Sequence, residues 1–100
     1  MKTIIEEKEG KWVVSVRGEL DTDTCEVFRT DIAPVMEKEH ATVELDLSQL
    51  NYISSTALRL LIILQQQVMK NGGQCYVSKV SDSVLEVLTM TGLSRSFLKE

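Results

Sequence analysis

The sequence has few of the residues that cross-link or interrupt a chain. Its 100 residues include two cysteines, one proline and five glycines. Cys25 and Cys75 lie far apart and fit no metal-ligand spacing, which argues against a disulfide-stapled or zinc-stapled domain. We expect both to be free thiols. No linker, repeat or low-complexity segment is visible, so we predict one domain over residues 1–100.

Clustered positive charge and long apolar runs are also missing. The net charge is −4, and the lysines and arginines are scattered, which argues against nucleic acid as a partner. The longest apolar run, Leu60 to Leu64, is far too short to span a bilayer. The first residues lack the apolar region of a signal peptide. We therefore expect a cytoplasmic protein that does not insert into a membrane.

Hydrophobic periodicity predicts alternating strands and helices. We expect a first strand over 3–7 and a second over 12–16 that pair as an antiparallel hairpin, with Gly18 ending the second. Further strands are predicted over 42–47 and 75–78. Helices are predicted over 24–38, over 55–70 and from Asp82 or Ser83 to Gly92, with Phe97-Leu98 packing back as a short edge strand.

This order, β-β-α-β-α-β-α, predicts an α/β fold with a mixed four- to five-stranded sheet and helices packed on it. The first helix should turn Val27, Phe28, Ile32, Val35 and Met36 toward one face, and Pro34 should kink or split it. The second helix is apolar nearly all round. That pattern predicts burial between two other helices, or else a partner-facing patch around Leu60 and Ile63.

Three consecutive hydroxyl side chains, Ser54, Ser55 and Thr56, stand at the predicted start of that second helix. Serine and threonine at this position are usually helix caps, and Ser54 is the best placed of the three to be one. A helix start also tolerates a phosphate, because its backbone N–H groups are unpaired and the helix dipole is positive there. The cluster is thus a set of caps or a phosphorylation site.

A family resemblance bears on this choice. The segment D-L-S-Q-L-N-Y-I-S-S-T-A-L-R, from Asp46 to Arg59, resembles the central motif of STAS domains, the family of bacterial anti-sigma factor antagonists. Gly18-Glu19-Leu20-Asp21 resembles the family's G-x-L-D turn, and Asn71-Gly72-Gly73 its N-G-G turn. The resemblance covers nearly the whole chain. It places the usual phosphoacceptor at Thr56, with Ser55 as the alternative, and Ala57 where the family usually has glycine.

The resemblance implies a binding module, not an enzyme, with no metal, cofactor or catalytic residue. Unphosphorylated, the chain would bind an anti-sigma factor that is also a serine/threonine kinase and so free a sigma factor. Phosphorylation by that kinase would release the chain, and a phosphatase would reset it. Asp21 and Asp23 are either plain helix caps or caps that also contact the partner. The implied partner-binding residues are Asp21, Asp23, Ser54, Ser55, Thr56, Ala57, Arg59 and Leu60.

Two other functions remain to be weighed. The chain also resembles the STAS accessory subunits of lipid ABC transporters, for which the hydroxyl need not be phosphorylated, and Ala57 in place of glycine keeps this alternative open. A hydrolase would need His40, the only histidine, beside the serines. His40 precedes the strand predicted over 42–47 and should lie at its far end, which argues against a catalytic triad.

Overall fold

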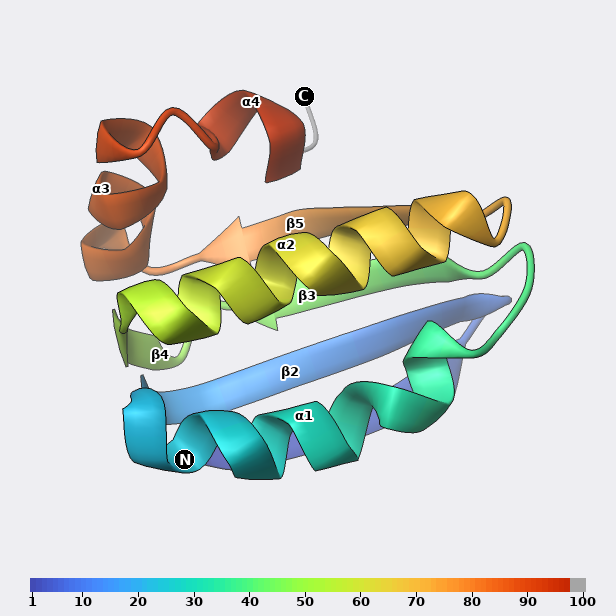
Figure 1. The fold of residues 1–100 in the computed structure, drawn as a ribbon, viewed down its shortest axis with the longest axis horizontal. Helices are drawn as coiled ribbons and strands as arrows, with labels where there is room; N and C mark the ends of the chain where they lie inside the picture. Colours follow the sequence, from blue (N-terminus) through green and yellow to red (C-terminus); the bar gives the residue numbers. More distant parts are fainter. Residues whose placement is uncertain (98–100) are drawn as a thin grey trace.

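The computed structural model describes residues 1–97, which form one mixed sheet with helices packed on it (Figure 1). The elements in chain order are β1 (Lys2–Lys8), β2 (Lys11–Leu20), α1 (Thr22–Met36), β3 (Thr42–Leu47), β4 (Leu50–Ile53), α2 (Ser55–Lys70), β5 (Gln74–Val80), α3 (Asp82–Met90) and α4 (Ser94–Phe97). Among these residues no helix is both long and apolar enough to cross a bilayer.

The sheet confirms the predicted class and element order. Its main path is β1-β2-β3-β5, with β4 pairing separately with β2. The β1–β2 hairpin is antiparallel, and all the other pairs are parallel. The short strand β4 was not predicted as a separate element. Its burial runs buried, exposed, exposed, buried, so it lacks the alternation that marks a strand.

Gly18 does not end the second strand as predicted. Strand β2 continues through it to Leu20, and the pairing with β4 shifts register between Gly18 and Glu19. Gly18 has a φ of +92° and donates its N–H to the carbonyl of Gln49. The glycine thus bends the strand where a side chain would be strained, and the last residues of β2 then reach the end of β4.

The helices differ from expectation in three places. Helix α1 begins and ends two residues earlier than the predicted 24–38 and is continuous through Pro34, so of the predicted kink or split, the split is wrong. Ser81, not Asp82 or Ser83, caps α3, because its hydroxyl accepts the N–H of Val84. The edge strand predicted at Phe97-Leu98 is also wrong for Phe97, which ends the short helix α4. Leu98 lies outside the described residues.

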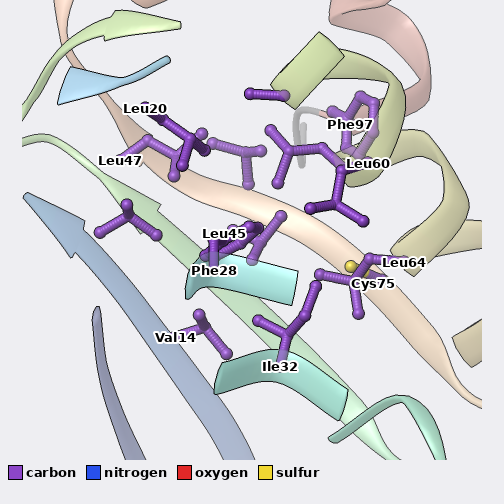
Figure 2. Close-up of a cluster of buried hydrophobic side chains, with 14 of the residues drawn as sticks. Val14, Leu20, Phe28, Ile32, Leu45, Leu47, Leu60, Leu64, Cys75 and Phe97 are labelled. Atoms are coloured by element: carbon purple, nitrogen blue, oxygen red, sulfur yellow. The ribbon is translucent and has the colours of Figure 1, made fainter. Parts of the chain in front are cut away.

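The core lies between the sheet and the helices (Figure 2). Helix α1 contributes Phe28, Ile32 and Val35, as predicted, but Val27 is 55% exposed. The run in α2 is mostly buried, and Figure 2 shows Leu60 close to Phe97. Cys25 and Cys75 are free and buried, and burial raises the pKa of the Cys75 thiol to about 12. That thiol is therefore neutral and unreactive at neutral pH.

Candidate functional site

The starts of α1 and α2 lie side by side at one end of the molecule, at the left of Figure 1. The register that pairs Leu20 with Ile53 brings these two chain segments together. The N–H of Ser54 donates to the carbonyl of Leu20 at 2.9 Å, across the two segments. The acidic turn at Asp21 and the hydroxyl cluster therefore form one site at the carboxyl ends of parallel strands, where α/β sheets usually place their sites.

Asp21 is the N-cap of α1. Its Oδ1 accepts the N–H of Thr24 at 2.9 Å, and its own N–H donates to Thr24 Oγ1 at 2.9 Å, which completes a capping box. The hydrogen bond from the Thr24 N–H, helped by the Thr24 hydroxyl, holds the pKa of Asp21 below its ordinary value. The site therefore carries a fixed carboxylate at neutral pH. Asp23, in the first turn of α1, is exposed.

Ser54 is the N-cap of α2, as predicted. Its hydroxyl oxygen accepts the N–H of Ala57 at 3.1 Å, and its φ of −82° and ψ of 165° are extended. Ser55 and Thr56 occupy the first two helical positions and are exposed. Neither of their hydroxyls bonds to any residue among 1–97. The structure thus separates one hydroxyl that caps the helix from two that are free to react.

Of the other site residues predicted on helix α2, some face the core and some face solvent. Ala57 is fully buried and Leu60 is 2% exposed, so both pack into the core and away from any partner. Arg59 is exposed, and Ile63 is 40% exposed. The patch, one of the two alternatives predicted for this helix, is therefore wrong at Leu60, because this side chain is buried in the hydrophobic core.

One exposed aromatic residue close to the hydroxyl cluster in the sequence was missed. Tyr52 on β4 is 51% exposed, two positions before the cap of α2. The sequence pattern that would mark Tyr52 as exposed was weak. Buried and exposed residues do not alternate along β4, and a tyrosine ring is also common in a hydrophobic core. An exposed tyrosine beside a polar rim is a common anchor at protein interfaces.

The histidine that a catalytic triad would need lies away from the hydroxyl cluster. His40 donates its N–H to Asn71 and stacks over Gly72, at the end of β3 opposite to the hydroxyls, as the sequence predicted. Residues 1–97 bring together no group of three histidine, cysteine or acidic side chains that could hold a metal.

Comparison with known proteins fits this arrangement. The sequence profile of the STAS domain family matches residues 2–100. A putative anti-sigma factor antagonist, BtrV of Bordetella bronchiseptica, is 26% identical over 97 residues, which are 97% of this chain and 84% of BtrV. The anti-sigma-B factor antagonist of Bacillus subtilis is 26% identical over 89 residues, 89% of this chain and 81% of that protein.

A solved structure extends the likeness to the fold. The crystal structure of an anti-sigma factor antagonist from Mycobacterium paratuberculosis superposes with a TM-score of 0.85 at 27% identity, covering 96% of this chain and 81% of that one. The chain therefore belongs to the STAS domain family.

Proposed function

We propose that the chain is an anti-sigma factor antagonist that is switched by phosphorylation of Thr56, with Ser55 as the alternative acceptor. In this proposal the partner is an anti-sigma factor that is also a serine/threonine kinase, and the chain acts as a binding module and not as an enzyme. The observation that supports it best is the Thr56 hydroxyl, exposed and unbonded at the start of α2 beside the Asp21 turn. The relatives named as antagonists support the class of partner.

The physics of a helix start suits such a switch. Thr56 lies at the second helical position, where unpaired N–H groups and the dipole favour an anion by up to about 2 kcal/mol. A phosphate there leaves the fold intact, but it adds about two negative charges to a surface that fitted a neutral hydroxyl. Repulsion and desolvation then release the partner, and a phosphatase restores the hydroxyl.

The proposed contact surface combines residues from both helix starts, of which Asp21 is half-buried and Asp23, Ser55, Thr56 and Arg59 are exposed. Asp21 and Asp23 provide its acidic side, and Ser55, Thr56 and Arg59 its polar centre. Ile63, four positions after Arg59 on the same helix, adds apolar area next to these groups. Ser54 contributes through the cap that fixes the helix start, and Ala57 and Leu60 are left out because they face the core.

The transporter-subunit alternative depended on Ala57 standing where the family usually has glycine. Against that argument stands the burial of Ala57, whose methyl group is fully buried. The buried methyl group therefore does not obstruct a partner protein that approaches Thr56. The antagonist function remains the better supported of the two.

The proposal is tested by incubating the chain with the kinase-type anti-sigma factor of its own organism and ATP, then locating the phosphate by fragment mass spectrometry. We expect one phosphate, on Thr56, with the helical circular dichroism unchanged. Thr56→Ala should lose the phosphate, and Thr56→Ser should keep it. Phosphate found only on Ser81 or Ser83 would refute the proposed switch, as would a loss of helical signal.

Asp21→Asn separates partner contact from capping. Asparagine caps a helix about as well as aspartate, so the free energy of unfolding should change by less than about 0.5 kcal/mol. If the carboxylate contacts the anti-sigma factor, the affinity should fall about tenfold, the loss of one charge-assisted hydrogen bond. Asp31→Asn on the same helix is the control and should leave the affinity unchanged. If the unmodified chain, Asp21→Asn and Asp31→Asn all bind the anti-sigma factor with the same affinity, Asp21 is a helix cap that does not contact the partner.

A further inference from the structure

Arg59 is a cation with no acidic partner. It is exposed, and it makes no ion pair with any residue among 1–97. Residues three and four positions away on a helix are its neighbours, and for Arg59 these are Ser55, Thr56, Ile62 and Ile63. The first turn of α2 contains no acidic residue. Nothing on its own helix therefore uses the charge of this guanidinium.

Arg59 and the two free hydroxyls line one shallow hollow of about 140 Å³, formed by Ser55, Thr56 and Arg59 alone. Water occupies about 30 Å³ per molecule in the liquid, so the hollow has room for the oxygens of a phosphate group. A phosphate on Thr56 would project from the residue that is three positions before Arg59. The planar guanidinium has five N–H donors in a geometry that matches two phosphate oxygens at once.

We propose that Arg59 binds the phosphate of phosphorylated Thr56 and so holds the switched-off state of the chain. This inference rests on the proposed phosphorylation of Thr56 and names how that site is regulated. In the unphosphorylated chain the guanidinium is free to contact the partner. Once the phosphate is present, the guanidinium turns to it. Phosphorylation then has two effects, because it adds negative charge to the contact surface and removes the contact between Arg59 and the partner. Asp21 and Asp23, at the adjoining start of α1, add negative charge that opposes the phosphate, and a local cation offsets that repulsion.

The test uses the full chain with phosphothreonine placed at position 56 by genetic encoding, so it needs no kinase. The phosphorus-31 chemical shift is followed against pH in the unmodified sequence, in Arg59→Gln and in Lys70→Gln. The Lys70 control removes the same charge from the exposed far end of α2. Arg59 favours the dianion, so its removal should raise the titration midpoint of the phosphate by about 0.3 to 1 pH unit, the range from an exposed helical ion pair to a charge-assisted hydrogen bond.

The expected result is a raised midpoint in Arg59→Gln only. An unchanged midpoint in Arg59→Gln would overturn the inference, and so would an equal rise in both variants, because that would reflect net charge and not contact. The circular dichroism of each variant shows that it is folded, which is expected because both side chains are exposed. Failure of the kinase to modify Thr56 would instead count against the proposed function, so the two failures are distinguishable.

Discussion

Replacing Thr56 with glutamate should weaken binding to the anti-sigma factor by about 30-fold to 1,000-fold, which corresponds to about 2 to 4 kcal/mol. The carboxylate would be desolvated against a surface that accepts a neutral hydroxyl, and pairing with Arg59 would withdraw that side chain from the partner. Because Thr56 is exposed and its hydroxyl unbonded, the free chain should keep its stability within about 0.5 kcal/mol. Titration calorimetry of each variant against the anti-sigma factor measures the affinity.

Thr56→Ala and Thr56→Gln are the matched controls. Alanine removes the hydroxyl without adding charge, so it should bind as tightly as threonine. Glutamine has nearly the size of glutamate but is neutral, so it separates bulk from charge and should retain most of the affinity. Equal losses for glutamate and glutamine would mean that the surface rejects size and not charge. A single carboxylate also has less charge than a phosphate, so glutamate should reproduce only part of the effect.

Gly73→Ala should be the most damaging single-methyl change in the chain, destabilising it by about 3 kcal/mol or more. A Cβ on Gly73 would overlap the carbonyl oxygen of Ala41 and would lie 2.9 Å from the Ala41 nitrogen. These are backbone atoms, and Gln74 donates its N–H to that same carbonyl at 2.9 Å. Either β5 moves away from β3 or this bond is lost. Chemical denaturation followed by circular dichroism gives the free energy of unfolding.

Gly10→Ala is the control for that experiment. Gly10 has a φ of +79°, so alanine there is strained, but a Cβ would meet nothing within 4 Å. Its cost should be limited to the backbone strain of about 1 to 2 kcal/mol. A Gly73→Ala variant as stable as Gly10→Ala would contradict the close approach of β5 to Ala41.

The fold was predictable wherever periodicity was strong. The limits of β3 and α2 agree with the prediction to the residue, because β3 alternates cleanly and α2 has both a serine cap and a glycine stop. The prediction failed where tertiary contacts overrode local signals. Gly18 looks like a strand end but sits at a bulge inside β2, and β4 exists only because β2 offers it a partner.

The candidate site was only partly predictable for a related reason. The sequence located the cap at Ser54 and the free hydroxyls after it, because both follow from position along one helix. It could not decide which side of α2 faces the core, since that helix is apolar nearly all round. Leu60 was therefore named among the partner-binding residues while burial of the helix stayed the other alternative, and it is buried; Tyr52 was overlooked.

The central claim is that one phosphate on Thr56 decides whether the chain binds its anti-sigma factor. The most direct measurement titrates the anti-sigma factor with the same preparation of the chain before kinase treatment, after it and again after phosphatase treatment. The account predicts tight binding, then binding weaker by at least about 100-fold, then full recovery. Equal affinity in the three samples, with the phosphate shown on Thr56 in the second, would contradict it.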